Sequence, residues 1–198
     1  MTDRARILVV AATARELAAP EQPDGWRTLR CGVGPVEAAA ATARAIAEHR
    51  PAAILHVGVA GARRARGLPP ATLVVGTEAR YCDLPEGLPA EWAARTVATP
   101  AALVDAVRRA APGVVALPIG TSARVGGTAG HAGCDVEAME GFAVLRAAQL
   151  AGVPAVEVRA ISNDVEEGDR ARWRLDDAFA AITAATPRLV AELVLCVS

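Results

Sequence analysis

Residues 134–164 read CDVEAMEGFAVLRAAQLAGVPAVEVRAISND and combine a helix-forming segment with a buried strand. The pattern predicts a helix over residues 136–150, followed by an apolar strand over residues 153–161. Pro154 is compatible with this strand because it falls at the strand's start. We therefore expect this stretch to bring an acidic pair and the polar end of a buried strand together.

The same alternation of strand and helix continues along the chain. Pro35 occupies the favoured first position of a helix predicted over residues 35–49, and a helix from residue 172 onward is predicted to break or kink at Pro187. The other predicted strands cover residues 6–12, 27–33, 53–57 and 71–77, with one or two more within 114–125. Such alternation predicts an α/β fold: one domain over residues 1–198, built as a three-layer α/β/α sandwich around a mixed, mostly parallel sheet.

Composition supports one folded domain and argues against several classes of partner. The 198 residues are 53% hydrophobic and carry a net charge of -1, which suits a single substantial core. All 21 basic residues are Arg, and they are scattered between acids, so nucleic acid is not an expected partner. No export signal is recognisable, and no apolar run reaches the ~20 residues of a membrane span. We expect a cytoplasmic protein without a membrane partner.

The cysteines show no spacing typical of a metal site or a disulfide framework. They lie far apart in the chain, at Cys31, Cys82, Cys134 and Cys196. Buried free thiols are the expected state, and neither a metal nor a cofactor is predicted.

Polar residues follow three predicted strands at their carboxyl ends, where ligands gather in α/β sheets. Glu16 follows the first strand, and its carboxylate could orient a water for attack on an anomeric carbon. The alternative is an acid in the first turn of a helix, facing solvent. Gly58, Ala60 and Gly61, with Val59 between them, form the exit of the third strand. Backbone amides could meet a ligand there, although a simple tight turn explains these residues equally well.

Met139 and Glu140 precede Gly141, which would let a ligand approach closely. A carboxylate can accept hydrogen bonds from both ribose hydroxyls, and its charge favours a cationic, oxocarbenium-like transition state. Met139 would pack on the sugar, although Met on a helix is more often core. Glu137 competes with Glu140 for the acidic role.

Asn163 ends the last predicted strand and has the chemistry to read a 6-oxopurine. Its amide oxygen can accept from a protonated N7 while its amide nitrogen donates to the 6-oxo group. The alternative is a turn residue facing solvent. Arg159, on the same strand, would be costly to bury without an acidic partner such as Glu16 or Glu140.

Six ordered segments, VVAATARE, CGVGPVEAAAATARAI, ILHVGVAGA, TLVVGTEARYCDL, VEAMEGFAV and VPAVEVRAISN, resemble the nucleoside phosphorylase and nucleosidase superfamily. Within it, VEAMEGF, RAISN and DRARWR resemble the futalosine hydrolase family, which removes hypoxanthine from futalosine on a route to menaquinone. The resemblance implies water activation by Glu16, ribose binding by Met139 and Glu140, and leaving-group activation at Asn163.

The resemblance also implies a substrate pocket that includes Val125 and Phe142, and a homodimer or higher homo-oligomer. Where relatives place an apolar or aromatic residue against the base, this chain has Arg124 and then Val125, which is a departure from the family pattern. Hydrolysis is expected over phosphorolysis, because Val59 replaces the family's Ser and Glu16 occupies the corner where phosphorylases admit phosphate. A phosphorylase, a methylthioadenosine-type nucleosidase and a non-catalytic nucleoside-binding subunit remain the alternatives.

Overall fold

A computed structural model describes residues 6–19, 26–85, 87–89, 91–128 and 133–197, and the statements below concern these residues. Its first strand is β1 (Ile7–Ala11), a fully buried run of ILVVA. β1 pairs in parallel with β2 (Trp26–Arg30) on one side and with β3 (Ala53–Ala62) on the other. The further strands and helices are β4 (Leu73–Tyr81), β5 (Thr96–Ala98), β6 (Val115–Thr121), β7 (Val136–Ala138), β8 (Ala155–Asp164), α1 (Pro35–His49), α2 (Ala101–Ala110), α3 (Gly141–Leu150) and α4 (Leu175–Cys196).

The sheet is mixed, with the order β2-β1-β3-β7-β6-β4-β5 and with β8 paired to both β3 and β4. Pairs that involve β1, together with β3–β8, β4–β6 and β6–β7, are parallel, whereas β3–β7, β4–β5 and β4–β8 are antiparallel. The predicted mixed, mostly parallel sheet is confirmed. The pairing also closes β3, β8, β4, β6 and β7 into a ring, which the strand pattern did not reveal.

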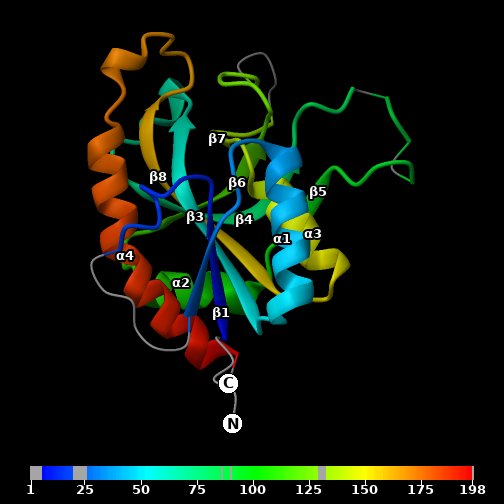
Figure 1. Cartoon of the computed structure of the whole chain (residues 1–198). Coiled ribbons are helices and arrows are strands. Elements are labelled where there is room, and N and C mark those ends of the chain that lie inside the picture. The colour runs from blue at the N-terminus through cyan, green and yellow to red at the C-terminus, as the bar shows by residue number, and fades with distance from the viewer. Residues whose placement is uncertain (1–5, 20–25, 86, 90, 129–132, 198) are drawn as a thin grey trace.

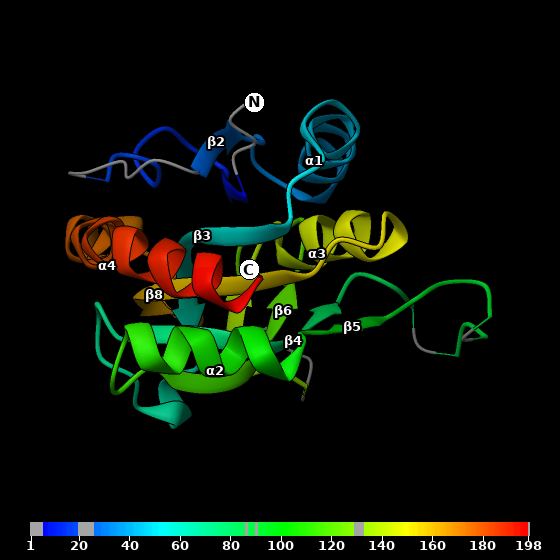
Figure 2. The ribbon, with the colours of Figure 1, turned by 90° about the horizontal axis from the view of Figure 1, so that it is seen from below.

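Successive side chains along a strand point to opposite faces of the sheet, where they pack into two separate hydrophobic cores. Ile7 and Val9 belong to the core beneath α2 and α4, whereas Leu8 and Val10 belong to the core beneath α1 and α3. Figure 1 shows the sheet between these helices, and Figure 2 shows α1 beside α3 on one flank and α2 beside α4 on the other. Apolar side chains, among them Ile119, Val136 and Ile161, fill a third cluster within the ring.

Two of the predicted boundaries are wrong for reasons of tertiary structure. The helix predicted over residues 136–150 begins only at Gly141, because residues 136–138 form β7 between β3 and β6. The strand predicted over residues 53–57 continues to Ala62. Residues 58–61 are therefore part of β3 rather than a tight turn beyond it.

The remaining predictions hold with smaller shifts. The helix of residues 35–49 has the predicted bounds, and Gly34 before it adopts the left-handed backbone (φ 92°) that favours glycine. β2 ends at Arg30, three residues early, and β8 extends to Asp164. Neither β5 nor α2 was predicted. α4 runs from Leu175 through Pro187 to Cys196, so the predicted break does not occur.

α4 is long and apolar enough, by length and composition, to cross a membrane. Core helices pass the same test, and α4 lies along β8 and β3 in this fold. Ile182, Leu189 and Leu193 on its inner face are fully buried. We therefore read α4 as a core helix.

Candidate active site

A cavity of about 190 Å³ opens at the ends of β1, β3, β7 and β8. Nine of the ten predicted site residues line it, namely Glu16, Val59, Ala60, Gly61, Val125, Met139, Glu140, Arg159 and Asn163. The sheet therefore brings together residues from the whole length of the chain, as expected for the carboxyl ends of neighbouring strands.

Glu16 lies in the turn after β1 and is 4% exposed, which contradicts the alternative of a solvent-facing acid. Its Oε2 accepts hydrogen bonds of 2.8 Å from the backbone N–H and the hydroxyl of Thr13. Its Oε1 accepts from the backbone N–H of Val59 at 3.3 Å. These donors fix the carboxylate at the cavity wall.

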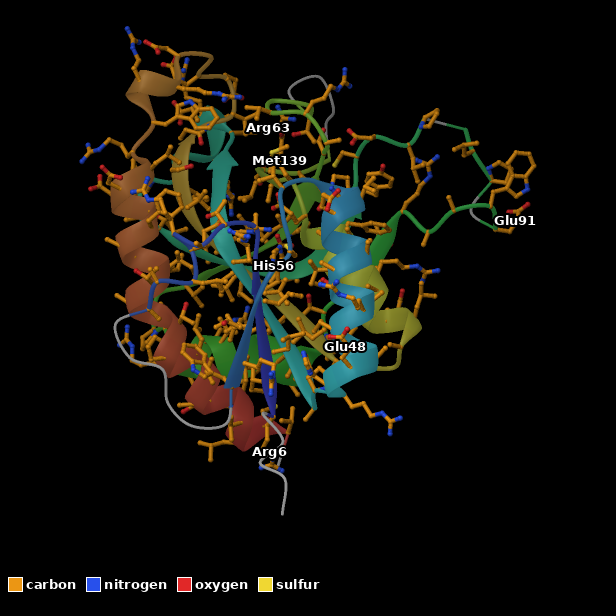
Figure 3. The ribbon with its side chains drawn as sticks, viewed as in Figure 1. Arg6, Glu48, His56, Arg63, Glu91 and Met139 are labelled. Atoms are coloured by element: carbon orange, nitrogen blue, oxygen red, sulfur yellow. The ribbon has the colours of Figure 1, made fainter. Side chains whose placement is uncertain are left out.

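Glu140 lies between β7 and α3 and is also 4% exposed. Its Oε1 accepts from the backbone N–H of Gly34 at 3.0 Å, and its Oε2 accepts from the guanidinium of Arg159 at 3.3 Å. Met139 lines the cavity beside it, and Figure 3 shows Met139 towards the same end of the molecule as Arg63. Each Glu140 oxygen keeps a lone pair with which it could accept from a sugar hydroxyl.

Arg159 is 1% exposed and is surrounded by carboxylates. Its Nε donates to Glu157 at 2.7 Å, and its Nη2 donates to Glu140 and to the ring of His56. Burial opposes the charged form, but the negative charges of Glu157, Glu140 and Glu16 raise the pKa of Arg159. The expectation that a buried Arg159 needs acidic partners is confirmed, and Glu157 is its shortest contact among them.

His56, in the middle of β3, is fully buried at the centre of the molecule (Figure 3). Its Nδ1 lies 3.0 Å from the carbonyl oxygen of Val10, which can only accept. Nδ1 therefore carries the proton, and Nε2 is free to accept from Arg159. Burial and, next, the charge of Arg159 lower the pKa of His56 well below its ordinary value, so the ring is neutral.

Glu157 lies beneath the site, fully buried on β8. Its Oε2 has no hydrogen-bond partner. Burial raises its pKa, against the opposing charge of Arg159. A Cβ at Gly141 would lie 2.0 Å from this Oε2, so the absence of a side chain at Gly141 makes room for Glu157. The sequence analysis predicted instead that the lack of a side chain at Gly141 lets a ligand approach closely.

Asn163 ends β8 at the cavity and is half-buried. Its Oδ1 accepts from the hydroxyl of Ser162 at 2.7 Å, and its Nδ2 donates to the carbonyl of Asp164 at 2.8 Å. One lone pair on the oxygen and one N–H on the nitrogen stay available to a ligand. The amide can thus present an acceptor and a donor together.

The segment of residues 122–128 forms one wall of the cavity, through Val125 and Gly126. Two carboxylates hold its ends. Asp83 accepts from the hydroxyl of Ser122 at 2.7 Å and from the N–H of residue 123 at 2.6 Å. Glu137 accepts 3.0 Å hydrogen bonds from the N–H groups of residues 127 and 128. Glu137 is thus committed to this wall, whereas Glu140 faces Arg159.

Phe142 is the predicted site residue that does not line this cavity. It starts α3 and points to the opposite side, where its ring stacks on Tyr81 with centroids 5.2 Å apart. Residues that the sequence did not single out do line the cavity. Trp173 and Phe179, from the C-terminal segment, add an aromatic portion to it. Their apolar character alone could not distinguish them from core residues.

Comparison with known proteins agrees with this geometry. Residues 28–195 match the Phosphorylase superfamily. A futalosine hydrolase from Streptomyces coelicolor is 39% identical over 194 residues, which cover 86% of this chain and 81% of that protein. The chain belongs to the futalosine hydrolase family of this superfamily. It is therefore an N-glycosyl hydrolase of the nucleosidase type.

Solved structures show the same fold at lower identity. The native futalosine hydrolase of Helicobacter pylori superimposes with a TM-score of 0.82 at 16% identity, over 96% of this chain and 98% of that one. A 5′-methylthioadenosine/S-adenosylhomocysteine nucleosidase from Colwellia psychrerythraea, in complex with adenine, gives 0.81 at 20% identity, over 94% and 95%. The futalosine hydrolase family thus shares its fold with nucleosidases of other specificity.

Proposed function

We propose that the protein hydrolyses the N-glycosidic bond of futalosine and releases hypoxanthine and dehypoxanthine futalosine, as a cytoplasmic step of menaquinone biosynthesis. The observation that carries this proposal is the convergence of Glu16, Glu140 and Asn163 on one cavity in a chain 39% identical to a futalosine hydrolase. The small-molecule substrate is held by this chain's own side chains and backbone.

The three residues divide the chemistry between them. Glu16 orients a water and takes its proton as the water attacks the anomeric carbon. Glu140 accepts from the ribose hydroxyls, and its charge stabilises the cationic sugar of the transition state. N7 takes its proton from solvent water as the bond breaks. The amide oxygen of Asn163 accepts the hydrogen bond of the resulting N7–H, and its amide nitrogen donates to the 6-oxo group, so the base departs as neutral hypoxanthine.

Water, rather than phosphate, is the proposed acceptor. A phosphate ion would need donors at the end of β3, but the N–H of Val59 already donates to Glu16 and its side chain has no hydroxyl. The buried carboxylate of Glu16 would also repel the anion. The contacts of Glu16 therefore support hydrolysis over phosphorolysis.

Chromatographic release of free base from futalosine, inosine and methylthioadenosine, each with and without phosphate, tests this function. Hypoxanthine from futalosine at the same rate in both conditions is the expected result. Glu16→Gln should lower kcat by about 100-fold or more, as for loss of a general base, and leave hypoxanthine binding intact. Release that requires phosphate, or none from futalosine, would overturn the proposal.

We further propose that the protein acts as a homodimer. An apolar groove of about 700 Å³ lies between α1 and α3, and its rim includes Val36 and Leu150, which are 78% and 72% exposed. Apolar side chains exposed together in this way are typical of an interface. Light scattering coupled to size exclusion should give twice the chain mass, and Leu150→Arg should give the monomer mass.

A further inference from the structure

The guanidinium of Arg159 is a buried cation that pairs with two buried carboxylates, those of Glu140 and Glu157. Its Nε is taken by Glu157, and its Nη2 lies between Glu140 and His56. Its Nη1 is directed to Gly58, where a Cβ would lie 2.2 Å from Nη1 and 2.6 Å from Oε1 of Glu16. The third nitrogen and the water-orienting carboxylate thus face each other across Gly58.

His56 adds a third contact to the two that the acidic partners make with this group. Glu157 holds only Nε, and the contact between Nη2 and Glu140 is long, at 3.3 Å. His56 approaches Nη2 from β3, the strand paired with β8, and contacts the same nitrogen as Glu140. The His56 ring is itself fixed, because its Nδ1–H donates to Val10 on β1.

An imidazole has a property here that a carboxylate lacks. In its Nδ1-protonated form it accepts a hydrogen bond without adding charge. Arg159 is the charged group that faces His56, and Glu157 and Glu140 contact Arg159 in turn. A neutral acceptor at His56 therefore orients Arg159 and leaves the negative charge of Glu140 for the sugar cation.

We propose that His56 is a positioning residue, whose Nε2 accepts from Arg159 and holds the guanidinium plane so that Nη1 faces Glu16 across Gly58. The inference rests on the proposed hydrolysis, in which Glu16 orients the water. It assigns a role to a residue 103 positions away from Arg159 in the chain.

Steady-state kinetics with futalosine compare His56→Leu, which has no acceptor, with His56→Gln, whose amide oxygen can take the place of Nε2. His56→Leu should lower kcat by on the order of 100-fold and leave KM within about twofold, as for a misplaced catalytic group. His56→Gln should recover most of the lost kcat. His49→Gln, at the end of α1 on the surface, is the matched control and should equal the wild type.

A double-mutant cycle with Arg159→Gln separates positioning from a merely structural role. If His56 acts through Arg159, adding His56→Leu to Arg159→Gln should lower kcat little further. Additive losses, or equal losses in His56→Leu and His56→Gln, would overturn the inference, as would an unchanged kcat in His56→Leu. Should Arg159→Gln fail to fold, the comparison of the two His56 variants decides.

The outcome also separates this inference from the proposed function. Absence of futalosine hydrolysis by the wild-type protein counts against the function. An active wild type whose kcat is insensitive to His56 counts against the positioning role alone.

Discussion

Gly58 controls how closely two buried, oppositely charged side chains approach each other. Arg159 and Glu16 both occupy the space that a side chain at position 58 would need. This close approach also explains why a glycine lies within a buried strand, where it would otherwise weaken packing. Gly58 is therefore important because the absence of a side chain leaves space for Arg159 and Glu16.

We expect Gly58→Ala to lower kcat by about 100-fold, because the new methyl group would displace the guanidinium of Arg159 and the carboxylate of Glu16. Activity assays and thermal unfolding measure the effect. Gly168→Ala is the matched control, since nothing lies within 4 Å of a Cβ at that position and it should retain full activity. Wild-type kcat in Gly58→Ala would show that the two charged groups have freedom to move.

Asn163 carries the proposed preference for 6-oxopurines. Asn163→Asp replaces the donor nitrogen by an acceptor oxygen, which suits a 6-amino group and disfavours a 6-oxo group. We expect the ratio of kcat/KM for methylthioadenosine over futalosine to rise by about 10-fold or more, as for loss of a directional hydrogen bond. An unchanged ratio would remove Asn163 from base recognition.

At the scale of secondary structure, prediction succeeded where a segment's own pattern decides its conformation. The residues of β1 are apolar throughout and those of α1 follow Pro35, so both were predictable. Residues 136–138 are different: VEA has helix-forming composition but forms β7, because Val136 and Ala138 are buried inside the ring. Local propensity was overruled there by tertiary pairing.

The residues of the candidate site also fall into those that could be predicted from the sequence and those that could not. Glu16 and Asn163 follow or end predicted strands, so their meeting could be predicted from where these strands end. Glu140 was chosen for its carboxylate beside Gly141, because the strand that precedes it, β7, was predicted as helix. His56 and Glu157 lie within strands and were missed. His56 meets Arg159 only across the pairing of β3 with β8, and the contact of Glu157, two residues from Arg159 on β8, matters only because that strand is fully buried there. Phe142 was misplaced because the start of a helix decides on which side its first residues point.

Substitutions of a buried and an exposed leucine in α4 test whether this helix packs in the core. Leu189→Ala should lower the free energy of unfolding by about 2–5 kcal/mol, because Leu189 is fully buried and truncation leaves a cavity. Leu195→Ala, on the same helix but 71% exposed, should change it by less than about 0.5 kcal/mol. Urea denaturation checks both variants. Equal effects would contradict the packing of α4 on the sheet.

For the whole molecule, the buried charge cluster links stability to pH. Burial and the charge of Arg159 lower the pKa of His56 in the folded state, so on acidification below about 6.5 the unfolded chain binds this proton first. The contribution of His56 to stability is therefore complete above that pH and is lost below it. Glu157 acts in the opposite sense, because burial raises its pKa and the folded state takes up its proton first.

We expect the wild type to lose stability faster than His56→Gln as the pH falls from 7.5 to 5. The slope due to one proton is at most about 1.4 kcal/mol per pH unit. Urea unfolding at several pH values measures the difference between the two proteins, and the same Glu157 is present in both. Parallel curves would mean that His56 titrates alike in the folded and unfolded chain.

The wall of residues 122–128 has a consequence for remodelling the enzyme. Its ends are tied to Asp83 and Glu137 largely through backbone N–H groups, which every residue except proline possesses. Gly127 must stay small, since a Cβ there would lie 2.0 Å from the hydroxyl of Ser122. New side chains can therefore be introduced against the base at residues 124 and 125, away from the carboxylates that perform the chemistry. Gly126 must stay glycine, because its backbone is left-handed (φ 69°).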